Sequence, residues 1–159
     1  MKKYGKYKIT KYIPVDSDPV NQLFLELQVH ENKFDSYKST KLANAQAYKT
    51  ELLDIVENQH GEMLIAKIDD KAVGLVAWFL EEECEFDEPY GYISDIIVSE
   101  PYRGQGIGQQ LLDKAMSHIK NTQVKRVHIG VLLANSDTKD FYSKNGFSDY
   151  SVEMTKELK

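Results

Sequence analysis

Arg103-Gly104-Gln105-Gly106-Ile107-Gly108 is the stretch of the sequence with the most specific structural content. The apolar segment 92–98 precedes it and the amphipathic segment 107–120 follows it, so the stretch joins a predicted strand to a predicted helix. Its three glycines allow a tight turn and leave backbone N–H groups uncovered by side chains. With a helix N-terminus, such amides form a cradle suited to a phosphate or pyrophosphate. The alternative is a glycine-rich turn that binds nothing.

Two common phosphate-binding loops do not fit these residues. A P-loop ends in Gly-Lys-Ser or Gly-Lys-Thr, whereas Gly108 is followed by Gln109-Gln110. A dinucleotide fingerprint has the spacing G-x-G-x-x-G near the first strand of a βαβ unit. Here the spacing is G-x-G-x-G, late in the chain. Both classes are therefore excluded.

The remainder of the chain predicts helices first and strands later. A strand over 7–13 precedes a helix with Asp18 as N-cap and Pro19 as its first residue, and a second helix spans about 40–58. The segments 63–68 and 71–80 then predict a hairpin around Asp69-Asp70. The second strand of that hairpin is apolar on both faces, which is typical of a central strand.

The C-terminal part continues as alternating strands and helices. The helix 107–120 is expected to connect the strand 92–98 to a parallel strand over 127–132. A short helix over 136–144 ends at Asn145-Gly146. The segment 151–158 is predicted to close the sheet as a last strand.

Two sequence blocks resemble the GNAT superfamily of acetyl-CoA-dependent N-acetyltransferases. The family's phosphate motif is Gln or Arg, two residues, Gly, one residue, then Gly or Ala; Arg103, Gly106 and Gly108 fill these positions. A second family block runs Asn-x-x-Ala-x-x-Leu/Phe-Tyr-x-Lys-x-Gly-Phe. It is matched by Asn135, Phe141, Tyr142, Lys144, Gly146 and Phe147, with Thr138 where Ala is usual. The match covers residues 60–159 well, whereas residues 1–59 share only a strand and two helices with the family.

The resemblance implies an α+β fold in one domain over residues 1–159. Family members have a mixed sheet of six to seven strands with about four helices, and the parallel fourth and fifth strands splay apart to admit acetyl-CoA. It further implies that the pyrophosphate lies on the loop amides, that the pantetheine arm pairs with the fourth strand, and that Asn135 bonds near that arm or serves as a helix N-cap. The expected cosubstrate-binding residues are Ile96, Val98, Arg103, Gly104, Gln105, Gly106, Ile107, Gly108 and Asn135.

The resemblance also implies transfer of acetyl to a primary amine of a small molecule or peptide, with Tyr142 as general acid. The alternative for Tyr142 is a structural tyrosine that packs within the apolar face of its helix. Many relatives carry Glu where this chain has Ser94. Asp95, which alternation places on the face of Ile93 and Ile97, is either a carboxylate on the substrate side or a buried structural group. A water chain or direct capture of neutral amine would replace a base, and a non-catalytic acyl-CoA-binding or regulatory module is the alternative function.

Composition limits the partners. The chain has 25 acidic and 20 basic residues, a formal charge of −5, and no basic face that would predict nucleic-acid binding. Six of the acids lie in residues 81–88, which form either a solvated loop or a region that attracts a cationic amine. The lone Cys84 and the absence of a long apolar run predict a cytoplasmic protein away from membranes. The histidine spacing predicts no metal site, and a homodimer is compatible with the sequence.

Overall fold

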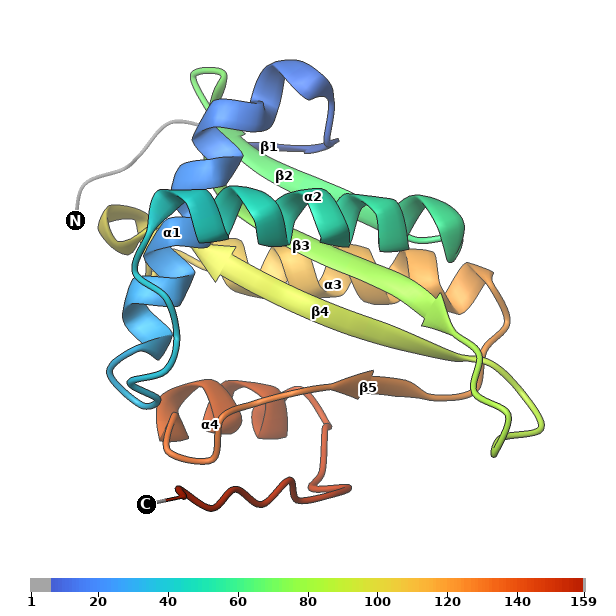
Figure 1. The fold of residues 1–159 in the computed structure, drawn as a ribbon. Coiled ribbons are helices and arrows are strands. Elements are labelled where there is room, and N and C mark those ends of the chain that lie inside the picture. The colour runs from blue at the N-terminus through green and yellow to red at the C-terminus, as the bar shows by residue number, and fades with distance from the viewer. Residues whose placement is uncertain (1–6, 159) are drawn as a thin grey trace.

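The computed structural model describes residues 7–158, in which a mixed sheet of five strands carries helices on both faces (Figure 1). The strand order follows the chain, β1-β2-β3-β4-β5; neighbours from β1 to β4 are antiparallel, and β5 is parallel to β4. The strands are β1 (Lys8–Lys11), β2 (Glu62–Ile68), β3 (Lys71–Glu81), β4 (Tyr90–Val98) and β5 (Val127–Ile129). The helices are α1 (Ser17–Glu31), α2 (Leu42–Asn58), α3 (Ile107–Asn121) and α4 (Ser136–Lys144), with 3-10 turns η1 (Pro14–Asp16) and η2 (Glu100–Tyr102).

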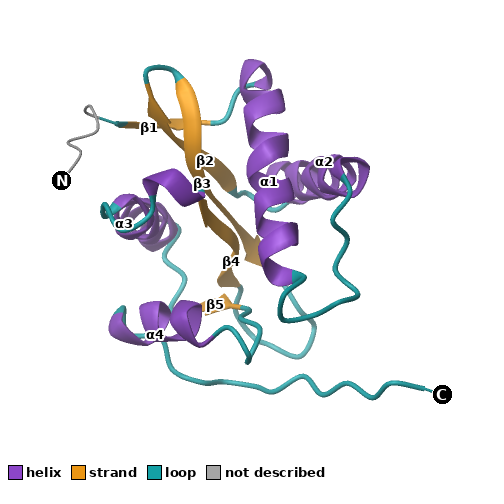
Figure 2. Ribbon diagram, turned by 90° about the vertical axis from the view of Figure 1, so that its left-hand side faces the viewer, coloured by secondary structure: helices purple, strands orange, loops and turns teal. Residues whose placement is uncertain are grey.

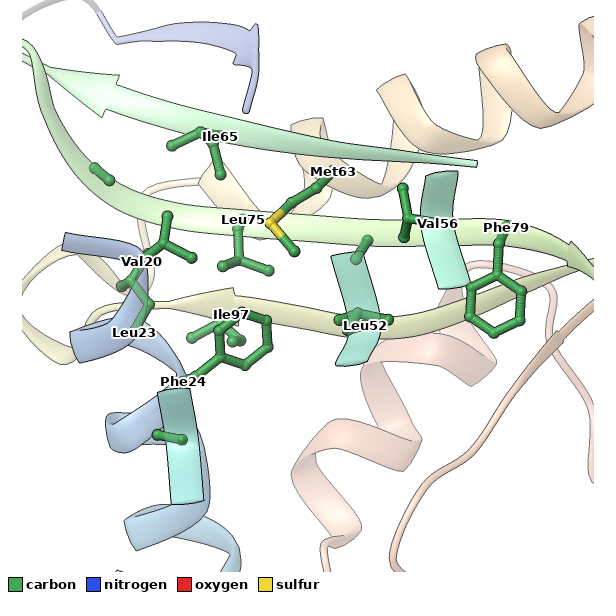
Figure 3. Close-up of a cluster of buried hydrophobic side chains, with 13 residues drawn as sticks. Val20, Leu23, Phe24, Leu52, Val56, Met63, Ile65, Leu75, Phe79 and Ile97 are labelled. Atoms are coloured by element: carbon green, nitrogen blue, oxygen red, sulfur yellow. The ribbon is translucent and has the colours of Figure 1, made fainter. Parts of the chain in front are cut away.

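Each face of the sheet has its own apolar core. Helices α1 and α2 cover one face, and α3 and α4 lie on the other (Figure 2). Phe24 of α1, Leu52 of α2 and Leu75 of β3 are buried together on the first face (Figure 3). On the second face α3 buries a stripe that follows helical spacing. Its members are Ile107, Leu111, Leu112, Ala115 and Ile119.

The central hairpin confirms the sequence prediction. Strand β3 buries every residue from Ala72 to Phe79, as expected for a strand covered on both faces. Asp69 and Asp70 connect it to β2 with φ values of 47° and 62°. Two consecutive left-handed residues are typical of the hairpin turn that matches strand twist, and Asp tolerates this conformation better than most residues.

Several predicted boundaries are wrong. Asp16, not Asp18, is the N-cap of α1, so Asp18 and Pro19 lie inside the first turn, where proline is tolerated. Strand β1 is shorter than 7–13 because Pro14 begins a 3-10 turn. Strand β5 ends at Ile129, three residues before the predicted end of the strand.

The expected closing strand is also absent from the described part of the chain. Residues 151–158 are exposed and belong to no strand, because the short β5 offers only three residues of edge to pair with. The sheet described by residues 7–158 therefore has five strands rather than six to seven. Within those residues, no helix is long and apolar enough to span a bilayer.

Candidate active site

The main opening in the fold lies where β4 and β5 separate. They pair only at Gly91 with Val127, Tyr92 with His128 and Ile93 with Ile129. Strand β4 then continues to Val98 paired with β3 alone, so one edge of its C-terminal half has no strand beside it. Figure 1 shows the two strands meeting near the start of β4 and diverging toward its arrowhead. This divergence is the predicted splay.

A β-bulge at Ser94 coincides with the end of that pairing. Ala77 pairs with Asp95 and Trp78 with Ile93, so Ser94 has no partner of its own on β3. Its hydroxyl donates to the Ala77 carbonyl at 3.2 Å. The extra residue shifts the alternation of side chains between the two faces.

Because of the bulge, the predicted orientation of Asp95 is partly wrong. Alternation placed this side chain with both Ile93 and Ile97. In the structure Asp95 bonds to α2 and lies on the face where Ile97 packs, whereas Ile93 packs on the α3 face. The sequence was right about Ile97 and wrong about Ile93, because the inserted Ser94 changes the face of every residue after it.

A cavity of about 1020 Å³ occupies this opening. Its wall comes from α1, α2, the β3–β4 loop, β4, β5, α4 and the segment after α4. Tyr48, Asp95 and Tyr142 lie in the wall, and so do Glu83 and Glu85 of the acidic stretch. The cavity therefore brings together side chains that lie far apart in the sequence.

Asp95 is a buried carboxylate held by a tyrosine. It is 8% exposed, and the Tyr48 hydroxyl donates to its Oδ2 at 2.8 Å. Burial raises the pKa of Asp95 to about 6, and the hydrogen bond from Tyr48 partly opposes that rise. A carboxylate with a pKa just below neutrality is largely ionised at pH 7 and is suited to accept a proton.

Tyr142 lies in the same cavity wall, on α4. Its side chain is 6% exposed and its ring packs edge-on against Phe147, with centroids 5.6 Å apart. The hydroxyl has no hydrogen-bond partner among the residues that the structure describes. Burial, with a smaller contribution from the Asp95 charge, raises the pKa of Tyr142, so the phenol keeps its proton at neutral pH. The ring is packed, as the alternative interpretation expected, but Tyr142 also lines the cavity.

The glycine loop connects β4 to α3. Gly104 and Gly106 have φ values of 71° and 81°, and no atom lies within 4 Å of a Cβ built at either position. Glycine is therefore needed for the backbone conformation rather than for space. Gly106 is the N-cap of α3, so the first amides of that helix are free to bind an anion.

Arg103 and Ile107 have structural partners within this loop. Arg103 Nε donates to the Val98 carbonyl at 2.8 Å, which ties the loop to the end of β4. The Ile107 side chain is 1% exposed in the α3 core, so only its backbone can face a ligand. Gln105 lies in the turn and Gly108 in the first turn of α3, with Val98 Cγ2 3.6 Å from a Cβ built at Gly108.

The remaining predicted binding residues lie at the two sides of the opening. Ile96 and Val98 are on the part of β4 that β5 does not pair with, so this edge of the strand has no strand beside it, although the Val98 carbonyl already accepts a hydrogen bond from Arg103. Asn135 begins α4, and its Oδ1 accepts a hydrogen bond from the Thr138 amide at 3.3 Å. The helix-cap interpretation of Asn135 is therefore correct; it does not exclude a contact with a ligand.

Two polar contacts of the site could not be inferred from the sequence. Tyr48 reads as a member of the α2 stripe, and no spacing connects it to Asp95. Gln109 Nε2 donates to Asn145 Oδ1 at 2.6 Å and so ties α3 to the end of α4. No group of three or more potential metal ligands occurs within residues 7–158.

Comparison with known proteins agrees with this geometry. A family model described as the acetyltransferase (GNAT) family matches residues 27–147, and the chain belongs to this family. An uncharacterized N-acetyltransferase of Bacillus subtilis, YycN, is 25% identical over 122 residues, 76% of this chain and 77% of that protein. The aminoalkylphosphonate N-acetyltransferase of Salmonella typhimurium is 25% identical over 143 residues, 90% of this chain and 86% of that protein.

A solved structure shows the same fold. Glucosamine-6-phosphate N-acetyltransferase from Arabidopsis thaliana superposes with a TM-score of 0.71 at 19% identity, covering 98% of this chain and 100% of that chain. The relatives are N-acetyltransferases that differ in the acceptors their names state. The family is therefore established, and the acceptor has to be argued from this chain's own cavity.

The buried Asp95 carboxylate predicts a pH-dependent stability. Its folded pKa of about 6 exceeds the ordinary value of 3.8, so the folded state binds more protons and loses stability as pH rises from about 4 to 6. Asp95→Asn removes the buried charge but keeps an acceptor for Tyr48. We expect the variant to be more stable than the wild type at pH 8 by about 1–3 kcal/mol.

Urea unfolding at pH 8 and pH 4 measures this difference. The two proteins are expected to converge at pH 4, where the wild-type carboxyl is protonated in the folded state. A stability difference that is the same at both values of pH would contradict the assignment of a raised pKa to Asp95.

Proposed function

We propose that the protein transfers the acetyl group of acetyl-CoA to a primary amine of a small molecule or peptide by direct attack in a ternary complex. One observation carries the proposal: a carboxylate with a raised pKa, Asp95, and a protonated phenol, Tyr142, are both buried in the wall of one cavity. This cavity lies at the splay of β4 and β5, where members of the family admit acetyl-CoA. Acyl transfer from a thioester to an amine needs one group that accepts a proton and one that donates it.

The residues at the opening fit acetyl-CoA. The amides of residues 105–108 and the N-terminus of α3 suit a pyrophosphate, and the positive φ at Gly104 and Gly106 keeps side chains away from it. The edge of β4 at Ile96 and Val98, which has no strand beside it, suits the amide groups of the pantetheine arm, except at the Val98 carbonyl that Arg103 already occupies. Arg103 acts by fixing the loop to Val98. Asn135 begins the helix that carries Tyr142, at the far side of the opening.

Asp95 and Tyr142 have complementary roles in this proposal. Acetyl-CoA supplies the activated acetyl group. Asp95 takes a proton from the acceptor ammonium, and the neutral nitrogen forms the C–N bond with the carbonyl carbon. Tyr142 gives its proton to the sulfur as the C–S bond breaks, and the second proton lost from the nitrogen restores the phenol. Asp95 then releases its proton to solvent, so one proton leaves per acetyl group transferred.

Direct attack is favoured over an acyl-enzyme on cysteine. Cys84 is exposed in the β3–β4 loop and does not line the cavity. The alternative function is a non-catalytic acyl-CoA-binding or regulatory module. It is motivated by Ser94, which stands where many relatives carry Glu and whose hydroxyl is used within the bulge. Release of CoA thiol in the presence of amines separates the two functions, because both would bind acetyl-CoA.

Tyr142→Phe tests the general acid. We expect kcat for thiol release to fall by about a hundredfold or more, because the departing sulfur loses its proton donor. The melting temperature should not change, since the removed hydroxyl has no hydrogen-bond partner among the described residues. Full activity in the variant would overturn the role of Tyr142. A fall in kcat accompanied by a lower melting temperature would show that the hydroxyl contributes to the packing of the fold instead.

Tyr48→Phe tests the base through the pH profile. Removing the hydrogen bond to Asp95 leaves its charged form less stabilised, so the pKa of Asp95 rises further above about 6. We expect the acid limb of the kcat/KM profile to move to higher pH. Tyr37→Phe is the control, because Tyr37 is 81% exposed and lies outside the cavity. A limb that does not move would show that Asp95 is not the group that must be ionised.

Gly106→Ala tests the loop. Alanine at a φ of 81° costs about 1–2 kcal/mol and distorts the amides at the start of α3, so the KM for acetyl-CoA should rise. Gly146→Ala is the matched control, since Gly146 has a φ of 87°, equally free space, and a place outside the loop. We expect the two variants to lose the same amount of stability. Only Gly106→Ala should raise the KM for acetyl-CoA. Equal KM values would contradict the assignment of the loop.

A further inference from the structure

We infer that the acceptor is an elongated amine with a second positive charge and no phosphate or other anionic group. This inference rests on the proposed function, because it assigns the occupant of the same cavity. It follows from three features of the cavity wall: its excess of carboxylates, its polar atoms without partners, and the distance that separates Glu83 and Glu85 from Asp95.

The cavity wall is acidic even after its ion pairs are removed. Six carboxylates line it, together with two lysines. Lys38 pairs with Glu31 at 3.1 Å and Lys139 with Asp149 at 2.8 Å. The carboxylates that line the cavity without an ion pair are Glu83, Glu85, Asp95 and Glu153. A cavity with this charge attracts a cation and repels an anion.

The nearest arginine does not neutralise the negative charge of the cavity wall. Arg126 lies over the rings of Phe86 and Tyr90, 4.7 Å and 5.6 Å from their centroids, but does not line the cavity. Burial and the Arg126 charge lower the pKa of His128, so this histidine adds no charge at neutral pH. With Arg126 included, the region still holds more carboxylates than cations.

Polar atoms without partners point to a ligand. The hydroxyl of Tyr142, a side chain only 6% exposed, has no hydrogen bond within the described residues. Gln28 and His128 also line this cavity, and Gln28 Oε1 and His128 Nε2 are buried atoms without a partner in the described part of the chain. Buried polar atoms usually have partners, and a bound amine would supply N–H groups.

The unpaired acids are separated along β4. Asp95 faces the reaction, whereas Tyr90, five residues earlier on the strand, has its hydroxyl bonded to Glu83. Five strand steps correspond to about 16 Å. An acceptor whose reactive nitrogen is near Asp95 and Tyr142 therefore needs an extended chain to bring a second ammonium to Glu83 and Glu85, whose side chains line the cavity and cover part of this distance.

The same charges argue against the acceptors named for two relatives. An aminoalkylphosphonate and a glucosamine phosphate each carry a strongly anionic group. Neither lysine in this cavity wall is free to bind such a group, because each has a carboxylate partner. The acceptor class of this chain thus differs from those of these relatives.

A matched set of acceptors tests the inference. Thiol release from acetyl-CoA is measured with octanediamine, octylamine and aminooctanoic acid, which differ only in having an ammonium, a methyl or a carboxylate at the far end. We expect kcat/KM to fall in that order, with at least about a tenfold advantage of the diamine over octylamine at low salt. The advantage of the diamine should shrink at high salt, because Glu83 and Glu85 are exposed to solvent and their charges are screened. Aminoethylphosphonate is expected to be the poorest acceptor.

Paired variants locate the effect. Glu83→Gln/Glu85→Gln removes two charges that line the cavity, and Glu82→Gln/Asp87→Asn removes two charges from the same loop outside it. Only the first pair should raise the KM for octanediamine, and neither should change the KM for octylamine or acetyl-CoA. Equal use of diamine and monoamine by the wild type, or equal effects of both pairs, would overturn the inference while leaving the proposed function intact.

Failure of the proposed function has a different signature. If no amine releases thiol, the acetyltransferase proposal is overturned, and calorimetric titration of the protein with octanediamine and octylamine then decides the cavity's preference. Tighter binding of the diamine, lost in Glu83→Gln/Glu85→Gln and kept in Glu82→Gln/Asp87→Asn, supports a site for dications. Equal binding of the two amines overturns it.

Discussion

The site depends on how briefly β4 and β5 stay together. Three residue pairs join them, and the bulge at Ser94 begins where the last pair ends. Separation leaves backbone groups of β4 free to bind a ligand as a further strand would. The bulge turns Asp95 toward α2, where Tyr48 holds it. Without the inserted residue, alternation would place the carboxylate on the face of Ile93, away from Tyr48.

The placement of Asp95 is costly for the fold. A buried carboxylate without a cationic partner has its pKa raised to about 6, so the folded state is less stable at neutral pH than it would be with a neutral amide there. Hydrogen bonding, above all from Tyr48, only partly offsets this cost. A structural role alone would be served as well by asparagine. The ionisable group is instead what the proposed proton-transfer role requires.

Local patterns in the sequence were enough to predict much of this molecule. The spacing of Leu111, Leu112 and Ala115 defines α3, and the unbroken apolar run of β3 defines the sheet centre. Neither pattern depends on distant residues. By contrast, the face on which Asp95 lies depends on register with β3, and its bond to Tyr48 joins residues 47 positions apart. Such contacts are set by tertiary packing, which one chain's periodicity does not encode.

The glycine loop and the acidic residues lie at opposite ends of β4. The glycine loop and the N-terminus of α3 lie beyond the C-terminal end of β4, whereas Glu83 and Glu85 lie before its first residue. The eight strand steps between these ends span about 26 Å, several times the Debye length of about 8 Å at physiological salt. In the proposed function, the acids can therefore attract a cation at one end of the opening without repelling an anionic pyrophosphate at the other. The formal charge of −5 is in this sense a local property of the residues that precede β4. Two ligands of opposite charge can approach one reaction centre from opposite ends.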